Sequence, residues 1–345
     1  MLHVLLLVGL EVYILNTIYS VGISGVGSYV PEKIVTNDDL SKIVDTSDEW
    51  IRTRTGICER RIAEKDIATS DLCTEAVKKA IRDANISPED IDLILVATVT
   101  PDMAFPSTAC IVQKNIGANN ASAFDISVGC SGFLYGLAIG SNFIATGAYD
   151  TVLVVGAEIL SRILDWKDRN TCVLFGDGAG ACVLQRCESG KGILSYDLGA
   201  DGANGHFLTQ PAGGSLNPAS IETVNKRLHY VHMDGREVFK FAVRSMEKAS
   251  KRALEKANIP LEAIDYLIPH QANIRIIESA AKRLKIKRDK VYVNLDRYGN
   301  ISSASIPIAL DEAFHKGYIK KDDIVLFVAF GAGLTWASVL LKWNK

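Results

Sequence analysis

The residue best placed to act as a nucleophile in this 345-residue sequence is Cys130, which stands between two glycines in the segment Val128-Gly129-Cys130-Ser131-Gly132. The segment follows an expected strand over residues 123–127 and precedes an expected helix. The free N–H groups at a helix start carry partial positive charge, which favours a thiolate over a thiol. We therefore expect Cys130 to be a nucleophile, although a free cysteine is also a common small buried hydrophobe.

Two other polar residues follow the Cys in an order that suggests shared chemistry. His270 lies just after an expected strand, in Pro269-His270-Gln271-Ala272-Asn273, and Asn300 lies in Tyr298-Gly299-Asn300. An imidazole can serve as a base or as a hydrogen-bond donor, and an amide is a neutral donor to a developing oxyanion. Papain-like proteases have the same Cys, His, Asn order, but their C-G-[SA]-C-[WY] signature is absent here.

An internal repeat with an offset of 173 residues predicts the elements that position these side chains. Helix, Asn and strand patterns over residues 75–96 recur over residues 251–268, and the apolar run 152–155 recurs at 325–328. Each half reads helix then strand three times, with a strand at 291–294 before Asn300. We expect an α/β fold of two pseudo-symmetric halves whose sheets are sandwiched between helix layers. Such a duplicated fold has no place in the papain-like proteases.

The predicted organisation is an apolar N-terminal extension over residues 1–19, a first half over 20–190 that carries Cys130, and a second half over 191–345 that carries His270 and Asn300. The extension is interrupted by Glu11, and a charge is costly in hydrocarbon, so we expect no membrane anchor. The glycines of the segment 22–27 have the wrong spacing for a dinucleotide-binding turn, and we expect a tight β turn there.

Composition excludes several classes of function. Thirty-eight Lys and Arg against forty Asp and Glu give a formal charge of −2, so no global basic field exists to hold nucleic acid. Seven cysteines, with no C-x-x-C pair, argue against a disulfide framework or a structural zinc site and fit a reducing cytosol. No cluster of metal ligands is evident, and we expect no metal.

Motifs along nearly the whole chain, from about residue 21 to residue 343, resemble the beta-ketoacyl-acyl-carrier-protein synthase III family of the thiolase-like superfamily. The resemblance is carried by eight segments in the family's order: 45–51, 53–57, 104–107, 129–133, 175–180, 269–273, 298–300 and 330–333. In this family the third residue of the catalytic set is an Asn, whereas the elongating synthases have a second His at that position. Chalcone-type synthases and HMG-CoA synthase share the Cys-His-Asn set, but the carrier-protein features below favour synthase III.

The resemblance implies a thiolase-like layered αβαβα fold and a condensing acyltransferase that initiates type II fatty-acid synthesis in the cytoplasm. Cys130 would take an acyl group from acyl-CoA, with acetyl-CoA expected, and malonyl-acyl carrier protein would then lose carbon dioxide and attack the thioester. His270 and Asn300 would donate hydrogen bonds to the enolate, and the N–H groups of Cys130 and Ala332 would form the oxyanion hole. No metal or redox cofactor is implied.

The same resemblance implies a coenzyme A site. Trp50 and Arg169 would flank the adenine, Arg54 would lie near the phosphates, and Asn273 would lie on the pantetheine path. Stacking on the indole and charge from the guanidinium groups suit these parts of the ligand.

Phe105 matches a residue that caps the acyl pocket of the opposite subunit, which implies a homodimer, and Phe105 and Leu174 are expected to shape that pocket. The starter acyl group is left open, because acetyl, propionyl and branched groups differ by only about 1–3 kcal/mol of pocket contact. The pathway is also open: a related synthase of polyketide or secondary metabolism and a non-catalytic acyl-binding protein are the alternatives.

A local basic segment points to an acidic partner. Residues 275–290 hold seven basic and two acidic residues, although the whole chain is at −2. On a helix, Arg275, Lys282 and Lys285 lie beside an apolar stripe, close in sequence to His270. We expect acyl carrier protein to dock there, on Arg275, Lys282 and Arg283, and by the family match also on Lys240.

Overall fold

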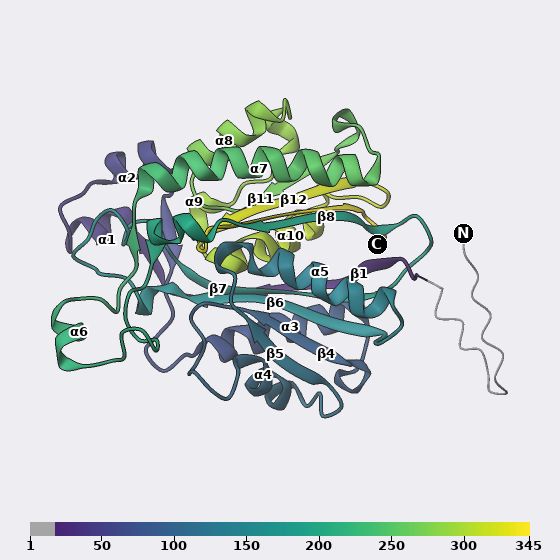
Figure 1. The fold of residues 1–345 in the computed structure, drawn as a ribbon, viewed down its shortest axis with the longest axis horizontal. Coiled ribbons are helices and arrows are strands. Elements are labelled where there is room, and N and C mark those ends of the chain that lie inside the picture. The colour runs from purple at the N-terminus through teal and green to yellow at the C-terminus, as the bar shows by residue number, and fades with distance from the viewer. Residues whose placement is uncertain (1–17) are drawn as a thin grey trace.

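Two β-sheets, each covered by helices on both faces, make up the fold in the computed structural model, which describes residues 18–345 (Figure 1). The first sheet has five strands in the order β1-β7-β6-β4-β5 and the second has four in the order β11-β12-β13-β8. The strands of the first sheet are β1 (Val21–Tyr29), β4 (Leu93–Ala97), β5 (Ser122–Ile126), β6 (Thr151–Ile159) and β7 (Asp177–Arg186). Those of the second are β8 (Gly192–Ala200), β11 (Tyr266–Pro269), β12 (Ile324–Gly331) and β13 (Thr335–Lys342).

The helices form three layers around these sheets, which gives the expected αβαβα order (Figure 1). One outer layer holds α3 (Thr69–Ala84) and α4 (Thr108–Ile116), and the other holds α7 (Gly235–Ala257) and α8 (Ile274–Arg283). The central layer holds α5 (Gly132–Ala145) and α10 (Ser305–His315), which pack between the two sheets. Both central helices are therefore apolar on most sides, and both begin at the turns that carry the candidate chemistry.

The 173-residue repeat is visible in matching hydrogen bonds. Asp92 Oδ2 accepts the N–H of Thr151 at 2.9 Å, and Asp265 Oδ2 accepts the N–H of Ile324 at 2.9 Å. The left-handed residues that end α3 and α7, Asn85 and Asn258, are separated by the same offset. The two halves are thus pseudo-symmetric in backbone detail as well as in topology. Their division at residue 190 falls between β7 and β8 and stays a proposal.

One core cluster joins the two halves. It includes Leu137 of α5, Val154 of β6, Leu310 of α10 and Phe327 of β12, all fully buried. Burial of each such side chain stabilises the fold by about 1.5–3 kcal/mol. The strand-to-helix turns at the start of α5 and α10 are therefore held against each other by a continuous apolar interior.

Two local expectations were wrong. Residues 22–27 lie within strand β1, where Gly25 and Gly27 let α3 approach so closely that a Cβ would lie 2.3 Å and 2.5 Å from its carbonyl oxygens. The segment 291–294 makes only one bridge, between Val291 and Leu267. Beyond it the side chain of Gln271 takes the backbone bonds that a strand would use, because it donates to Tyr292 O and accepts from Asn294 N.

Smaller elements complete the chain. The short helices are α1 (Asn37–Ser41), α2 (Asp48–Thr55), α6 (Ile221–Asn225) and α9 (Leu295–Tyr298), and the short strands are β2 (Ile34–Thr36), β3 (Glu59–Arg61), β9 (Leu208–Thr209) and β10 (His232–Met233). Two 3-10 turns matter for the site: η2 (Gly129–Ser131) and η7 (Ser302–Ala304). Among residues 18–345, no helix is both long and apolar enough to span a membrane.

The predicted apolar extension lies almost entirely outside the described residues, which begin at Ile18. Tyr19 already belongs to the fold: its N–H donates to Ala145 O at 3.1 Å, and Arg186 stacks on its ring.

Candidate active site

Cys130 lies in η2, at the junction between β5 and α5, as the glycine-flanked turn predicts. Gly129 has a φ of 53°, a left-handed conformation that glycine adopts without strain. The turn formed by residues 331–333 packs directly on it: a Cβ at Gly331 would lie 2.5 Å from Cys130 N, and one at Gly129 would lie 2.9 Å from Ala332 N. Two glycines therefore bring the backbone N–H groups of Cys130 and Ala332 to the same small region.

The pKa of the Cys130 thiol differs from the expectation that the helix start favours a thiolate. Burial raises its pKa to about 12, and this outweighs the lowering by its own backbone N–H and by a hydrogen bond with Ser302. The helix start therefore does not by itself make a resting thiolate. At neutral pH the residue is a thiol that must lose its proton when it reacts.

His270 is fully buried at the end of β11, and burial lowers its pKa to about 3, so its ring is neutral. Its Nδ1 lies 2.7 Å from Ser305 Oγ, which also accepts the N–H of Gln271 at 3.3 Å. Both groups are satisfied when Ser305 donates its hydroxyl hydrogen to Nδ1. That arrangement leaves the ring hydrogen on Nε2, which has no partner among the described residues.

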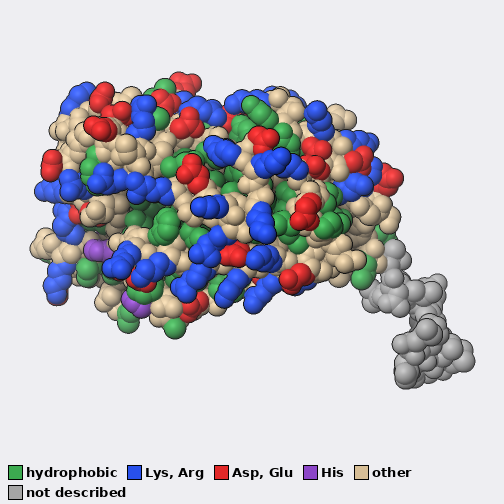
Figure 2. Space-filling view, turned by 90° about the horizontal axis from the view of Figure 1, so that it is seen from above, with side chains coloured by type: hydrophobic (Ala, Val, Ile, Leu, Met, Phe, Trp, Pro, Cys, Tyr) green, Lys and Arg blue, Asp and Glu red, His purple; other side chains and the backbone are tan. Residues whose placement is uncertain are grey.

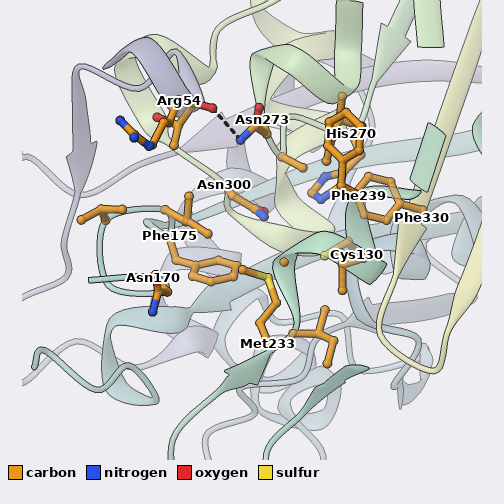
Figure 3. A pocket seen from close by; sticks show the side chains of 18 of the residues that line it. Arg54, Cys130, Asn170, Phe175, Met233, Phe239, His270, Asn273, Asn300 and Phe330 are labelled. Carbon is orange, nitrogen blue, oxygen red and sulfur yellow. Dashed lines mark hydrogen bonds between the residues drawn. The ribbon is translucent and has the colours of Figure 1, made fainter. Parts of the chain in front are cut away.

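Asn300 lies beside His270 in the turn before α10. Its Oδ1 accepts the N–H of Ser302 at 2.8 Å, so its Nδ2 amide hydrogens are turned toward the cavity. Its backbone is held on both sides, since its N–H donates to Leu174 O and its carbonyl accepts from Gly176 N. Figure 3 shows His270 and Asn300 pointing into the same part of the cavity as Cys130. Both side chains thus present N–H donors to a group bound beside the thiol.

A single cavity of about 420 Å³ brings the predicted residues together. Most of the predicted catalytic and coenzyme A residues line it: Trp50, Arg54, Cys130, Leu174, His270, Asn273 and Asn300. Its other walls include Phe239, Met233 and Phe330 (Figure 3). Residues from both halves therefore form one tunnel that leads from the surface to the thiol.

The outer end of the cavity carries an aromatic ring between two cations. The guanidinium carbon of Arg54 lies 4.6 Å from the centre of the Trp50 ring, and that of Arg169 lies 5.1 Å from it. Arg169 does not line the cavity itself and donates to Asp45 O at 2.9 Å. Asn273 Nδ2 donates to Arg54 O at 3.1 Å, which joins this end to the start of α8 (Figure 3).

A second, more apolar cavity of about 310 Å³ adjoins Cys130 on its other side. Ala332 and Ser302 line it, together with the apolar residues Val99, Leu160, Ile163, Phe175, Leu208 and Val231. Neither Leu174 nor Phe105 is among its residues: Leu174 lines the first cavity, and Phe105 is 84% exposed on the loop before α4. Within one chain, then, the structure does not bring Phe105 to the thiol.

The basic segment forms α8 and the turns after it, as predicted. Arg275 donates to Thr53 O at 3.0 Å, and Thr53 precedes Arg54, which lines the first cavity. Arg283 pairs with Glu247 of α7 at 3.0 Å, and Lys240 pairs with Glu237 at 2.5 Å. Figure 2, which looks onto the α7 and α8 side of the molecule, shows Lys and Arg side chains spread across this face.

Sequence reasoning missed three residues around the thiol and its partners: Glu158, Ser302 and Ser305. The offset of 173 residues could have indicated Ser302, because it is the counterpart of Gly129. Glu158 and Ser305 gave no local signal, since only the fold brings them to the site.

Comparison with known proteins identifies the family. Two family models match, described as the 3-oxoacyl-[acyl-carrier-protein] synthase III domain over residues 124–202 and its C-terminal domain over residues 254–343. The beta-ketoacyl-[acyl-carrier-protein] synthase III of Caldanaerobacter subterraneus is 68% identical over 324 residues, which cover 94% of this chain and 98% of that protein. The chain belongs to the synthase III family. It is a condensing acyltransferase that initiates type II fatty-acid synthesis.

Solved structures agree with this assignment. The 3-oxoacyl-[acyl-carrier-protein] synthase III of Aquifex aeolicus is 50% identical, with a TM-score of 0.87, over 94% of this chain and 100% of that one. A priming beta-ketosynthase of the R1128 polyketide pathway is 34% identical, with a TM-score of 0.89, over 98% and 99% of the two chains. The thiolase-like fold inferred from the repeat and the motifs is thus confirmed.

Proposed function

We propose that this synthase transfers an acyl group, with acetyl from acetyl-CoA as the expected starter, to Cys130, and then condenses it with malonyl-acyl carrier protein. The observation that carries the proposal is the convergence of a thiol and two neutral N–H donors, from Cys130, His270 and Asn300, at the inner end of one cavity. The products are 3-oxoacyl carrier protein, carbon dioxide and free coenzyme A.

His270 and Asn300 act on the malonyl group. Loss of carbon dioxide places negative charge on the malonyl thioester oxygen. Neutral N–H donors can stabilise this charge by hydrogen bonds. His270 supplies Nε2–H and Asn300 supplies Nδ2–H, each already held by a hydrogen bond on its other side. Preorganised donors of this kind each stabilise a transition state by about 3 kcal/mol.

The oxyanion on the acyl-Cys side has a separate set of donors. The backbone N–H groups of Cys130 and Ala332 would serve it, since both residues line the apolar cavity in which the acyl chain would lie. The enolate and the tetrahedral oxyanion would therefore form at two different places in the site. The side chains of His270 and Asn300 would stabilise the first, and the backbone N–H groups of Cys130 and Ala332 would stabilise the second. No metal is required in this scheme.

Coenzyme A enters through the first cavity. Trp50 and Arg169 would hold the adenine, Arg54 the phosphates, and Asn273 the pantetheine arm, with Leu174 beside the thioester. The stacked arrangement of Arg54 and Arg169 on Trp50 supports this, because a flat cationic and aromatic surface suits a nucleotide.

Acyl carrier protein would dock on the face that carries Lys240, Arg275, Lys282 and Arg283. We expect Arg275→Glu to weaken use of malonyl-carrier protein at least about tenfold and to spare acylation by acyl-CoA. Lys78→Glu, on the opposite outer layer, is the matched control and should change neither half-reaction. An equal loss in both half-reactions of Arg275→Glu would argue against docking there.

A cytoplasmic homodimer completes the proposal. Phe105 is exposed, and β5 lies at one edge of its sheet with Phe124 also exposed, so both features are available to a second copy. A partner's Phe105 would then close the apolar cavity beside Cys130. Sedimentation should give a mass of two chains, and Phe124→Lys should shift it toward one; a wild-type monomer would refute the dimer.

The decisive experiment is the intact mass of the purified protein after incubation with acetyl-CoA, with Cys130→Ser as control. An acetyl-sized gain on the wild type alone establishes acyl transfer to Cys130. If there is no gain, a panel of longer and branched acyl-CoAs decides between a different starter and a non-catalytic protein.

A further inference from the structure

A carboxylate that the proposed chemistry does not use lies buried beside the nucleophile. Glu158, near the end of β6, is fully buried, and it accepts five hydrogen bonds. Oε2 accepts from Thr98 Oγ1 at 3.2 Å, Val99 N at 3.1 Å and Thr100 Oγ1 at 2.7 Å. Oε1 accepts from the hydroxyls of Ser302 and Ser303, each at 3.0 Å. None of these partners is a cation.

Burying the charge of Glu158 would therefore be energetically costly if this residue served only to hold two segments together. A buried carboxylate without a counter-charge carries a desolvation penalty of several kcal/mol, which hydrogen bonds only partly offset. The two serines that bind Oε1 belong to η7, the turn directly after Asn300. Glu158 thus connects the first half of the chain to the turn that carries a reactive group.

Ser302 stands in a conformation that favours glycine. Its φ is 44°, and its counterpart 173 residues earlier, Gly129, has a φ of 53°. For a residue with a Cβ this left-handed conformation is strained. The hydroxyl that comes with the Cβ donates to Glu158 Oε1 at 3.0 Å, and Ser302 lines the same cavity as Cys130, whose pKa it lowers. The chain thus accepts backbone strain at a position where a hydroxyl can link the carboxylate to the cavity of the thiol.

Acylation leaves a proton without an acceptor. Cys130 must lose its thiol hydrogen as its sulfur attacks the acyl carbonyl, and burial raises the pKa of that thiol. His270 is neutral and already carries its hydrogen on Nε2, the nitrogen that has no partner among the described residues, so Nε2 has no free lone pair with which to accept the thiol proton. The remaining group within reach is Glu158, through Ser302.

We propose that Ser302 and Glu158 form a proton relay that deprotonates Cys130 during acylation, an inference that rests on the proposed acylation of this cysteine. The Cys130 S–H bond breaks as the bond between sulfur and the acyl carbon forms. The thiol proton passes to Ser302 Oγ, and the hydroxyl proton of Ser302 passes to Glu158 Oε1. When the tetrahedral intermediate collapses, the departing sulfur of coenzyme A takes the proton back by the same path, which restores the carboxylate.

The electrostatics of the buried site suit this exchange. Burial raises the pKa of Glu158, although its hydrogen bonds oppose the rise, so the carboxylate is a stronger base than in water. Burial first, and then the nearby charge of Glu158, raise the pKa of the Cys130 thiol. In the proposed relay, Glu158 receives the thiol proton only when an acyl group is present for the sulfur to attack.

Ser302→Gly tests the relay with little change to the backbone. Glycine keeps the left-handed conformation and the N–H that orients Asn300, and it removes the hydroxymethyl group. We expect acylation at saturating acetyl-CoA to fall about 100-fold with KM within about threefold. Carbon dioxide release from malonyl-carrier protein in the absence of acyl-CoA should stay within about threefold, since it needs no thiol deprotonation.

Ser303→Ala is the matched control, and Glu158→Gln is the second variant. The single hydroxyl hydrogen of Ser303 lies within reach of both Glu158 Oε1 and Ala97 O, so its loss weakens the carboxylate site while the hydroxyl of Ser302 stays, and acylation should fall less than tenfold. Glu158→Gln keeps the side-chain shape and should reproduce the selective loss of Ser302→Gly.

The outcomes separate the relay from the alternatives. Wild-type acylation in Ser302→Gly refutes the relay, and an equal loss of acylation and decarboxylation in both variants shows a structural role and also refutes it. A wild type that gains no acyl mass from any acyl-CoA refutes the proposed function, and the relay with it.

Discussion

Gly331→Ala tests how closely the turn after β12 must approach the nucleophile. A Cβ at this position would lie 2.5 Å from Cys130 N and 3.2 Å from both Cys130 Cα and Cβ. To bring the first contact to an ordinary 3.4 Å, the two segments must separate by about 0.9 Å. Both are backbone, so no side-chain rotation can relieve the contact.

Such a separation acts on the rate more than on the fold. Overpacking costs about 1–3 kcal/mol of stability. A displacement of about 1 Å at a reacting group can lower a rate about 100-fold. We therefore expect Gly331→Ala to remain folded and to acylate about 100-fold more slowly at saturating acetyl-CoA, because the N–H of Cys130 and that of Ala332 no longer converge on the oxyanion.

The assay is the time course of the acyl mass gain, with thermal unfolding followed in parallel. Gly202→Ala is the matched control, because a Cβ there meets nothing within 4 Å and the position has no left-handed φ. Gly202→Ala should behave as wild type. If Gly331→Ala is folded and acylates within about threefold of wild type, the inference that this contact positions the oxyanion donors is wrong.

Three further predictions concern neighbouring groups. Ser305→Ala should lower malonyl decarboxylation about tenfold, since the lost hydrogen bond of about 1–1.5 kcal/mol fixes the hydrogen of His270 on Nε2; an unchanged rate of carbon dioxide release would contradict this. Asn300→Asp should lower condensation at least about 100-fold because a carboxylate repels the enolate, while the mass assay still shows acylation; equal activity would exclude the donor role. Burial alone would raise the pKa of Glu312, but hydrogen bonds, first that of Arg297, lower it to about 2 from 4.5. Its stabilising contribution is therefore full above pH 4.5 and lost as the pH falls toward 2, so denaturant unfolding should show wild type losing its advantage over Glu312→Gln across that range.

Much of the fold could be predicted because the chain repeats itself. Apolar runs such as 152–155 and 325–328 recur at a fixed offset, and repeated patterns of helix and strand specify repeated layers. The strand expected at 291–294 failed because a side chain from another segment, Gln271, competes for its backbone groups. Local pattern carries no information about such a competitor.

The candidate site divides in the same way. Cys130, His270 and Asn300 could be chosen from the sequence, because residue type, flanking glycines and strand ends are local features. The protonation states of these side chains could not be predicted from the sequence. Burial keeps Cys130 a thiol and His270 neutral, and burial depends on what the rest of the chain packs around them.

The sequence by itself determined the layered architecture, the family and the three reactive side chains, because each of these can be inferred from periodicity, repeats or short motifs. Only the tertiary structure decided which hydrogen His270 carries, how the thiol is held and which carboxylate lies behind it. Ser305 and Glu158 are 35 and 28 positions in the chain from the groups they serve. Hydrogen bonds between such distant segments form only when the strands and helices pack against one another, and a linear pattern does not encode those contacts.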